Sequence, residues 1–583
     1  MTRTDTFVVG TLVLVLALVA GLIGVPAMQL SSTATPSQGQ PRASAPVADA
    51  RPYVEGALGA PSSVTPLTAR TQVDRDLVAL LFSGLVRNGP SGTIVPDIAE
   101  RWSVDKAGTT WTVDLRDDVR WHDGQPVTSN DVVFTIRTLQ DPAYTGPSST
   151  SWNEVTVAAS GPQRVTFTLQ TPLGGFLQAL TQPLAPAHLL ADVPVGSLAD
   201  DPFGREPIGS GTFALVELTD ESASLAPALE LDLSEEGPSP GPTSAAATDS
   251  LTTAAPAQRP SRPLPYLAGI DFRFYSDPAK LATDFRTGTL DGASGISRQL
   301  AAELGAAPGT RLLRYPGATL TAVILNLRPS HPEFASPAVR TALLQAIDRG
   351  RLIDEAYAMF AAGATGLIPP SSPLFDPMAD PLVTYDRKAA GTALRKLDWT
   401  HNERGWYMPN ATKSQALEVL SPTQATNPGL FVAAEAVVRD WKALGFTVTH
   451  TPLPAGEFVT DRLATGAFQV AVVDVTVGLD PDLYPLLASS QTLTGGSNVM
   501  GIQDPVLDAL LVKARAPGTD AVRAAAYSAL QKQLAAGRYL LPLAFADEVI
   551  VIRDTLQGPV LRQASDPSDR FWDVLTWRLA VDR

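Results

Sequence analysis

One short stretch of the sequence gathers side chains that could perform acid–base or metal chemistry. Residues 111–134 read WTVDLRDDVRWHDGQPVTSNDVVF, and place His122 beside Trp121 and a dense set of aspartates. A histidine near carboxylates can transfer protons or bind a metal ion. However, His122 has no second histidine or carboxylate at the spacing of a metal site. The stretch therefore lacks a complete catalytic or metal-binding set.

The same stretch has a clear pattern of secondary structure. Trp111, Val113 and Leu115 alternate with polar residues, which predicts a half-buried strand. The HDG sequence that follows favours a turn, because Asp-Gly tolerates positive φ. Thr128 and Asp131 then have the spacing of a capping box at the start of a helix. We therefore interpret the stretch as strand, turn and capped helix, with structural roles for its polar residues.

The rest of the chain offers no stronger catalytic motif. There is no cysteine, and the sequence contains no HExxH, GxSxG, Walker or GxGxxG pattern. Carboxylates are abundant but form no recognisable constellation. The five histidines are scattered along the chain, at His122, His188, His331, His401 and His450. We expect no catalytic residues, no metal site, no cofactor and no enzyme activity.

Length and charge limit the remaining classes of function. The chain has 583 residues, which is more than one hydrophobic core usually serves, so two or more lobes are expected. Its net charge is −15, with a pI of about 4.9. Phosphate binding needs clustered Lys and Arg, so the acidic balance argues against a nucleic-acid partner.

The N-terminal residues predict export from the cytoplasm. Phe7 to Val25 form an uncharged run of 19 residues behind Arg3, long enough to span a bilayer. Two interpretations of residues 1–28 compete. An uncleaved signal anchor is favoured by the length of the run, and a cleaved signal peptide by the small residues around Ala27. Without cysteine, a lipid-anchored form is excluded.

Two further segments are too poor in large apolar residues to fold. Residues 29–50 are rich in Ser, Pro, Ala and Gln, and we expect a disordered tether. Residues 233–265 include SEEGPSPGPTSAAATDSLTTAAPAQRPSRPLP, and we expect a disordered surface insertion.

The second half of the chain alternates strand and helix patterns. The apolar strand TLTAVILNL (Thr319–Leu327) is followed by Ser336-Pro337, an N-cap and N1 pair for the helix AVRTALLQAIDRGRLIDEAYA. Further on come the strand ALEVLS, a helix that ends at Gly445, the strand FTVTHTPL, a short helix and the strand Phe468–Val475. This β-α-β order predicts a parallel sheet flanked by helices.

Several segments together resemble a known protein family. They are DLVALLFSGLVRN, the run from IVPDIAERW through WHDGQPVTSNDVVFTI, PIGSGTFAL, VRTALLQAIDRGRLID and LPLAFADEVIVIRDTLQG. In this order they are similar to the bacterial extracellular solute-binding proteins of the oligopeptide/dipeptide/nickel type, family 5, which serve ABC importers. The similarity runs from about Arg51 to the end of the chain, and the combination is far more specific than any single segment.

The resemblance implies an α/β, two-lobed periplasmic-binding-protein-like fold, type II of the large cluster, with an extra subdomain in lobe one. Lobe one would cover residues 51–314 and return over 542–583, and lobe two would cover 315–541. Two strands, near Leu313–Ala322 and Pro542–Ile552, would form a hinge that lets the lobes close on a ligand. The protein would act as a monomer at the outer face of the cytoplasmic membrane. Its partners would be a peptide or similar solute, the membrane, and an ABC permease and ATPase.

One departure from the family puts the ligand in question. Peptide-binding members hold the peptide's α-ammonium with an Asp shortly before a Pro, but VAVVDVTVGLDPDLYP has Val477 or Gly478 there. Nearby Asp474 and Asp480 could substitute for the missing Asp, or could simply cap and turn the chain. The departure also favours an alternative: a membrane-tethered, non-transporting paralogue with a regulatory or scaffolding role.

Three aromatic residues complete the set of expected ligand contacts. Trp152 lies in a loop where the family borders its cleft, Tyr484 follows the DPD turn, and Phe545 lies on the returning hinge strand. For Trp152 the other interpretation is an ordinary packed ring. The expected ligand-binding residues are thus Asp474, Asp480, Trp152, Tyr484 and Phe545.

Overall fold

The computed structural model describes residues 51–89, 93–147, 152, 155–228, 265–478, 480–492 and 496–580. Contacts divide the chain into Met1–Pro46 and Val47–Arg583, and every described residue lies in the second unit. The expected N-terminal helix, the tether and all of the insertion except Pro265 lie outside the described residues. Within those residues, no helix combines the length and the apolar character that crossing a bilayer requires.

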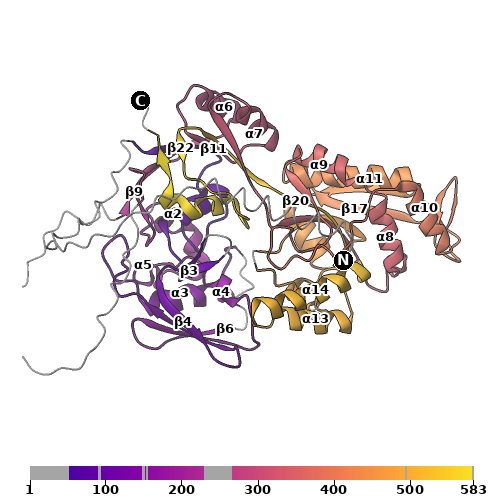
Figure 1. The fold of residues 1–583 in the computed structure, drawn as a ribbon, viewed down its shortest axis with the longest axis horizontal. Coiled ribbons are helices and arrows are strands. Elements are labelled where there is room, and N and C mark those ends of the chain that lie inside the picture. The colour runs from indigo at the N-terminus through magenta and orange to yellow at the C-terminus, as the bar shows by residue number, and fades with distance from the viewer. Residues whose placement is uncertain are drawn as a thin grey trace, which may run out of the picture. The chain divides into compact units, whose positions relative to one another are not determined.

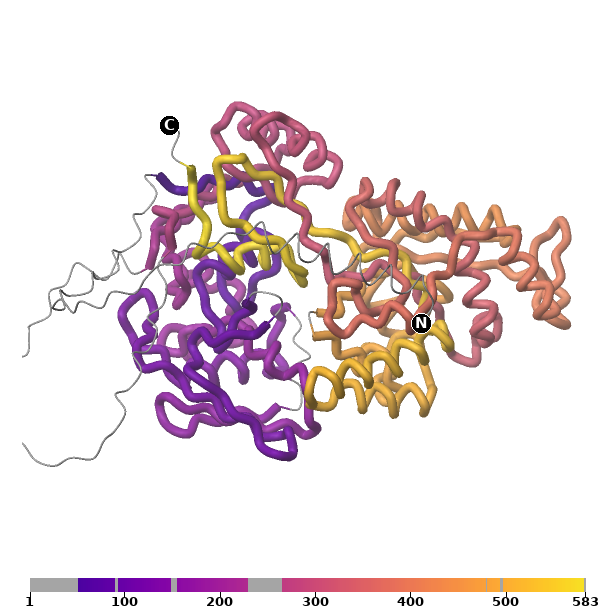
Figure 2. Tube along the Cα trace, viewed as in Figure 1, coloured from indigo at the N-terminus to yellow at the C-terminus, as the bar shows by residue number. Residues whose placement is uncertain are grey.

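A seven-stranded mixed sheet organises the first part of the fold. Its strands in spatial order are β12 (Thr310–Tyr315), β21 (Glu548–Arg553), β11 (Gly292–Ser294), β1 (Tyr53–Leu58), β10 (Ile270–Tyr275), β9 (Ser222–Pro227) and β8 (Phe213–Leu218). β1 runs parallel to β10 and β11, and β21 pairs antiparallel with β11 and β12. The C-terminal segment, yellow in Figure 2, thus returns against β11 and β12, which lie more than two hundred residues earlier in the chain.

A separate four-stranded antiparallel sheet carries the WTVDLR segment. Its order is β4 (Ala99–Val104), β5 (Thr110–Leu115), β7 (Arg164–Leu169) and β6 (Val155–Ala159). Trp111, Val113 and Leu115 on β5 are buried, as their alternation predicted. α3 (Ser129–Leu139) begins with the predicted capping box of Thr128 and Asp131. The prediction of strand, turn and capped helix is confirmed.

Helices and short strands complete this part of the fold. The helices are α2 (Gln72–Leu81), α4 (Phe176–Ala179), α5 (Ala187–Leu190), η3 (Val195–Asp200), η4 (Pro202–Gly204), α6 (Pro278–Arg286), α7 (Arg298–Gly305) and η9 (Pro567–Thr576). The short strands are β2 (Val86–Asn88), β3 (Ile94–Pro96), β22 (Leu556–Gln557) and β23 (Arg578–Leu579).

The second half forms a six-stranded sheet. Its strands in spatial order are β14 (Ala361–Gly363), β20 (Leu540–Ala546), β13 (Thr319–Leu325), β19 (Val470–Thr476), β17 (Ala416–Pro422) and β18 (Thr447–Leu453). β17 runs parallel to β18 and β19, but β13 pairs antiparallel with both β19 and β20. The expected parallel order therefore holds for β17, β18 and β19, whereas β13 and β20 add antiparallel pairs to the sheet. The return strand β20 completes the sheet and runs against β13, which alternation of strands and helices along the chain could not show.

Helices cover both faces of this sheet. They are α8 (Pro337–Gln345), α9 (Arg349–Tyr357), α10 (Arg387–Lys396), α11 (Pro428–Leu444), α12 (Tyr484–Leu487), α13 (Pro505–Arg515) and α14 (Asp520–Gly537), with the shorter η6 (Pro332–Phe334), η7 (Glu457–Leu463) and η8 (Ser489–Thr492). A separate hairpin consists of β15 (Thr400–Asn402) and β16 (Gly405–Tyr407). Figure 1 shows α9 and α11 on one side and α13 and α14 on the other. Val323 and Val472 join the core under α8, α9 and α11, whereas Ile324 and Val473 join the core under α13 and α14. Alternate residues of each strand are thus buried on opposite faces, which explains the continuous apolar runs.

The expected single helix after Pro337 is instead two helices. α8 ends at Gln345, and α9 begins at Arg349. Between them Asp348 accepts a hydrogen bond from the Arg351 N–H (3.1 Å) and caps α9. A short acid that binds backbone N–H groups competes with helix continuation, and this competition overrides the helical apolar pattern.

Two chain crossings join the two sheets. Residues 316–318 connect β12 to β13, and Asp547 connects β20 to β21. We call residues 51–315 and 548–580 the first lobe, and residues 319–546 the second lobe. Pro542, the expected start of the return, still pairs with β13, so the chain leaves the second sheet later than expected.

Candidate functional site

His122 is a structural residue of the first lobe. Its Nδ1 accepts a hydrogen bond from the Gly209 N–H (3.2 Å), and its Nε2 lies 3.1 Å from the Gly211 carbonyl oxygen. A Cβ on Gly209 would lie 1.9 Å from the Leu81 carbonyl oxygen, so the PIGSG loop needs glycine to come this close to α2. The histidine thus ties the WHDG turn to the PIGSG loop.

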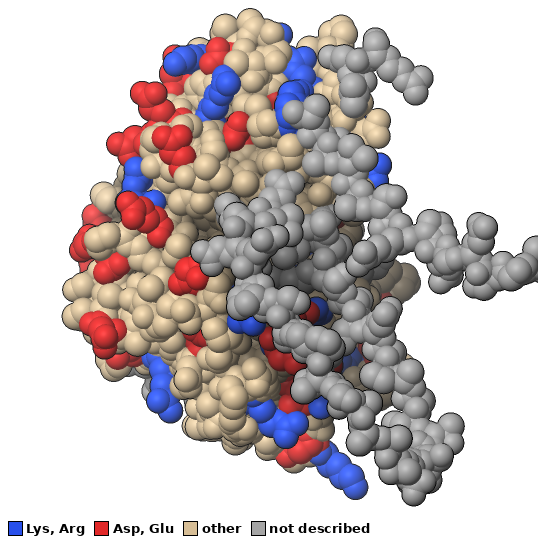
Figure 3. Space-filling view, turned by 90° about the vertical axis from the view of Figure 1, so that its left-hand side faces the viewer, with Lys and Arg blue, Asp and Glu red and all other residues tan. Residues whose placement is uncertain are grey.

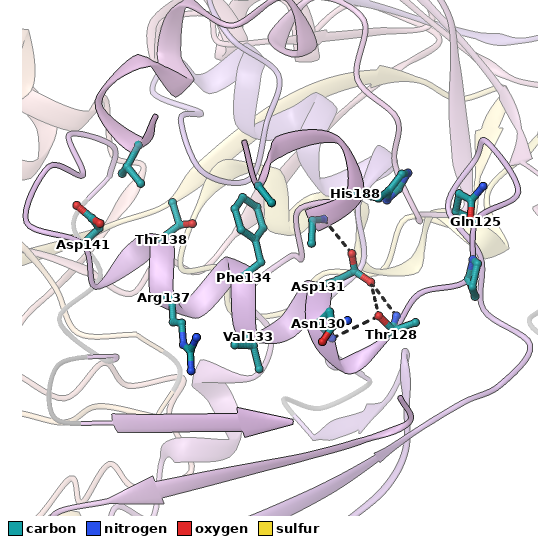
Figure 4. Close-up of a pocket in the computed structure, with 14 residues that line it drawn as sticks. Gln125, Thr128, Asn130, Asp131, Val133, Phe134, Arg137, Thr138, Asp141 and His188 are labelled. Carbon is teal, nitrogen blue, oxygen red and sulfur yellow. Dashed lines mark hydrogen bonds between the residues drawn. The ribbon is translucent and has the colours of Figure 1, made fainter. Parts of the chain in front are cut away.

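A hollow of about 750 Å³ lies beside α3 in the first lobe (Figure 4). The carboxylate of Asp131 in its wall accepts hydrogen bonds from the N–H groups of Thr128 (2.8 Å) and Ala187 (2.9 Å). His188 at its edge binds Asp123 (2.8 Å). These polar groups already serve caps and local pairs, so they are committed to the fold of the first lobe.

Two of the expected aromatic contacts are packed inside the lobes. Trp152 is 2% exposed, and its ring lies edge-on to Phe176 in the first-lobe core (5.8 Å between centroids). Phe545 on β20 is also 2% exposed and belongs to the core that includes α13 and α14. Neither ring is open to a ligand in this structure.

Asp480 lies in a turn that two ion pairs hold rigidly. Arg523 donates to both of its carboxylate oxygens (2.9 and 2.5 Å), and Arg515 binds Asp482 (2.9 Å). The guanidinium carbon of Arg515 also lies 4.5 Å from the ring centroid of Tyr484, which is half-buried. The charge of Asp480 is thus neutralised within the second lobe, while Tyr484 keeps part of its ring exposed.

The first lobe touches this turn through a glycine loop. The Gly174 N–H donates to the Arg515 carbonyl oxygen (2.7 Å). A Cβ on Gly175 would lie 3.2 Å from the carboxylate of Asp480, and one on Gly174 would lie 3.3 Å from the Cα of Pro517. We call this contact the glycine latch. It joins the lobes at a point separate from the two crossings.

We expect that an engineered disulfide can form across the glycine latch. Because the chain has no cysteine, the double variant Gly174→Cys/Pro517→Cys would contain only the new pair. The positions are within the Cα–Cα reach of a disulfide, so mild oxidation is expected to cross-link most of the protein. Thiol counting and reduced/non-reduced mass spectra measure the yield. Ser160→Cys/Thr166→Cys, whose hydroxyl oxygens lie 3.4 Å apart within the first lobe, is the matched control. Cross-linking of the control alone would show that the lobes do not meet at this loop.

Asp474 has a different setting from Asp480. It lies near the end of β19, opposite Thr321 of the first crossing strand. Its Oδ1 accepts a hydrogen bond from the Thr321 hydroxyl (2.7 Å), and its Oδ2 accepts one from the Asn427 amide (3.3 Å). Thr321 also shares a hydrogen bond with the Tyr357 hydroxyl (2.5 Å). Together with Arg298 of the first lobe, these residues form what we call the Asp474 cluster.

The carboxylate of Asp474 is both accessible and partly desolvated. The residue is exposed, yet crowding by nearby protein atoms raises its pKa above the ordinary value of 3.8, and the bonds from Thr321 and Asn427 only partly oppose this. Among the described residues, no Lys, Arg or His nitrogen lies within 4 Å of the carboxylate, so a cation from outside could bind it.

Secondary structure places every member of the Asp474 cluster. Asn427 is the N-cap of α11 and accepts from the Leu430 N–H (3.0 Å), which fixes its side chain beside β19. Tyr357 is the last residue of α9, and Arg298 is the first residue of α7. Sequence reasoning identified only Asp474. The Asn-Pro pair at 427–428 was the one available signal for Asn427, since it marks a helix start.

The crossing at Asp547 adjoins this cluster. Arg314 at the end of β12 donates from Nε to the Asp547 carboxylate (2.9 Å), so an ion pair links the two crossings. Arg298 donates from Nε (3.2 Å) and Nη2 (2.9 Å) to the Asp547 carbonyl oxygen. Ligand contacts in the Asp474 cluster would therefore lie close to the two chain crossings.

Metal and nucleic-acid chemistry find little support in this arrangement. Among the described residues, no group of three or more His, Asp or Glu side chains could hold a metal ion. The face of the molecule in Figure 3 carries acidic and basic side chains interspersed, rather than the continuous basic surface that nucleic acids need.

Comparisons with known proteins agree with this arrangement. The family described as "Bacterial extracellular solute-binding proteins, family 5 Middle" matches residues 93–497, more than half of the chain. Protein XP55 of Streptomyces lividans is 26% identical over 529 residues, which cover 87% of this chain and 86% of the relative. Solved structures also share the fold of this chain.

Two of these structures contain different ligands. The oligopeptide-binding protein AppA from Bacillus subtilis, in complex with a nonapeptide, has a TM-score of 0.68 and 19% identity, covering 91% of this chain and 99% of that one. NikZ from Campylobacter jejuni, in complex with Ni(L-His), has a TM-score of 0.66 and 22% identity, covering 90% and 99%. The mixed α/β fold is thus that of periplasmic binding proteins, and it accommodates more than one class of solute.

Proposed function

The chain belongs to the bacterial extracellular solute-binding proteins of family 5, and we propose that it captures a peptide between its two lobes and delivers it to an ABC importer. Proteins of this family are non-enzymatic and act outside the cytoplasm. Attachment to the membrane through residues 7–25 and a monomeric state stay predictions. No finding favours the alternative of a non-transporting, membrane-tethered paralogue.

One observation carries the proposal: the residue Asp474, exposed but with a partly desolvated carboxylate, lies beside the crossing strand β13. A peptide's α-ammonium would form a charge-assisted hydrogen bond there, in place of the family's missing Asp. Asp474 lies near the carboxyl end of β19, which runs parallel to β17, and α/β sheets tend to bind ligands beyond such ends. The peptide bound by AppA supports a peptide here as well.

The other expected contacts take different roles in this proposal. We propose Tyr484 as a rim contact, since its ring is only half-buried. Asp480 would act through the glycine latch rather than on the ligand, because Arg523 holds both of its oxygens. Trp152 and Phe545 would shape their lobes from within, since both rings are buried.

Native mass spectrometry tests the proposal directly. Protein purified from its own cells without unfolding is expected to carry a bound mass that is lost at raised collision energy. Fragmentation of that mass into a ladder of amino-acid residues would identify a peptide. A co-purified solute without peptide bonds would contradict the peptide assignment. An empty protein that also fails to bind a random peptide pool would contradict the receptor role.

A further inference from the structure

Arg298 reaches from the first lobe toward the second. It is the first residue of α7, directly after the N-cap Ser297. One edge of its guanidinium, formed by Nε and Nη2, is bound to the Asp547 carbonyl oxygen. Its guanidinium carbon lies 5.4 Å from the centroid of the Tyr357 ring in the second lobe. The group is thus fixed by the crossing at Asp547 and lies over the Tyr357 ring.

The second edge of this guanidinium is uncommitted. A guanidinium has two edges that can each donate two parallel hydrogen bonds, and the edge of Nη1 and the remaining Nη2 proton receives no partner among the described residues. No carboxylate among those residues lies within 4 Å of Arg298, in contrast to Arg314, which pairs with Asp547. Arg298 also lines a cavity of about 230 Å³, together with Ser294, Gly295 and Glu548. There is therefore room beside it for a small polar group.

The charges around Arg298 do not cancel it by direct contact. Burial raises the pKa of the Asp474 and Glu548 carboxyls, and the positive charge of Arg298 only partly opposes this rise. A half-buried guanidinium that touches only a carbonyl oxygen and a ring is well suited to bidentate recognition of a carboxylate. Asp474 has no Lys, Arg or His nitrogen within 4 Å among the described residues, so a ligand that brings a carboxylate to Arg298 would gain from a positive charge of its own at Asp474.

We propose that Arg298 is a carboxylate receptor, and that the solute is zwitterionic where it meets the Asp474 cluster, with its ammonium on Asp474 and a free carboxylate on the open edge of Arg298. This inference rests on the proposed function and narrows its ligand class to short peptides or amino-acid-like solutes. Each lobe supplies one charged contact, so both are made only when the lobes are together.

Three peptide pools test this inference by isothermal titration with the full chain. The first contains tripeptides without acidic side chains and with free termini, the second is the same pool with amidated C-termini, and the third is amidated but contains one Glu. Wild-type protein is expected to bind the free-acid pool about tenfold or more tightly than the amidated pool. Tight binding of the third pool would assign the carboxylate to a side chain, and weak binding would assign it to the C-terminus.

Arg298→Gln separates recognition from hinge structure. It is expected to weaken binding of the free-acid pool by about tenfold or more and to leave the affinity for the amidated pool unchanged. The preference for a free carboxylate would thus be lost. Arg286→Gln, an exposed first-lobe arginine paired with Glu303, is the matched control and should preserve the preference. Equal weakening of the free-acid and amidated pools would overturn the inference and make Arg298 a purely structural hinge contact. If no pool binds wild-type protein, the proposed function fails and the inference falls with it.

Discussion

Arg570→Leu is expected to lower the free energy of unfolding by about 3–5 kcal/mol. Arg570 on η9 is 4% exposed and donates to both oxygens of Asp76 (2.7 and 2.6 Å) and to Glu55 (2.6 Å). Glu55 and Asp76 are 0% and 1% exposed. Removal of the guanidinium would leave two buried carboxylates without their counter-ion.

Glu55, Asp76 and Arg570 form an ion-pair triad whose members come from distant parts of the chain. Glu55 lies on β1 and Asp76 on α2, whereas Arg570 belongs to the segment that returns after the second lobe. Burial pulls the pKa of Arg570 down, but Asp76 and Glu55 outweigh that effect and hold it above its ordinary value. The triad therefore pins the C-terminal return to the first strand and helix of the first lobe.

Chemical denaturation followed by tryptophan fluorescence measures the effect. Arg101→Leu, which breaks an exposed pair with Asp114, is the matched control and should cost at most about 1 kcal/mol. Addition of Asp76→Asn and Glu55→Gln to Arg570→Leu should restore part of the loss, since no buried charge then remains. A loss below about 1 kcal/mol for Arg570→Leu would show that the triad does not hold the return segment.

The pH dependence of Arg570→Leu follows from the same carboxylates. Burial already raises the pKa of Asp76 above 3.8 in the presence of Arg570, and loss of the arginine should raise it further. A carboxyl whose pKa is higher in the folded state binds its proton more tightly there, so protonation favours folding. The stability deficit should therefore be complete at neutral pH and shrink as the pH falls.

Local structure could be predicted from the sequence wherever neighbouring residues decide it. The capping box at Thr128 and Asp131 and the left-handed Gly445 at the end of α11 are both present. Each depends on bonds within a few residues. The direction of β13 and the break before α9 were missed, because the first depends on β20, more than two hundred residues away, and the second on one side chain that caps instead of continuing a helix.

In the candidate site, too, the sequence predicted what neighbouring residues decide and missed what distant contacts decide. Asp474 stood out because a lone acid near the end of an apolar strand is unusual. Asp480 looked equivalent in the sequence, but Arg523 lies 43 positions further along and only the fold brings it to the carboxylate. Arg298 and Tyr357 carry no local signal, since a helix start with Arg and a helix end with Tyr are ordinary. Contacts between lobes are set by the crossings, which no local pattern encodes.

Asp474→Asn is expected to weaken binding of a peptide with a free α-ammonium by about tenfold or more. A charge-assisted hydrogen bond contributes about 1.5–3 kcal/mol, and 1.4 kcal/mol corresponds to tenfold in affinity. The substitution keeps the shape of the side chain. The introduced amide can turn its oxygen to Asn427 and its N–H group to the Thr321 hydroxyl, which can itself donate to Tyr357. The hydrogen-bond network thus survives and only the charge is lost.

The pH profile and a control variant decide whether this charge acts on the ligand. Crowding raises the pKa of Asp474, so wild-type affinity should fall with decreasing pH at values above the ordinary 3.8, while the Asp474→Asn profile stays flat in that range. Asp461→Asn removes the same charge from an exposed position of the second lobe and should leave affinity unchanged. N-acetylated peptides should bind wild type and Asp474→Asn equally, because they lack the ammonium. If Asp474→Asn binds free and acetylated peptides with wild-type affinity, the carboxylate only holds Thr321 and Asn427 in place, and the ammonium must be bound elsewhere.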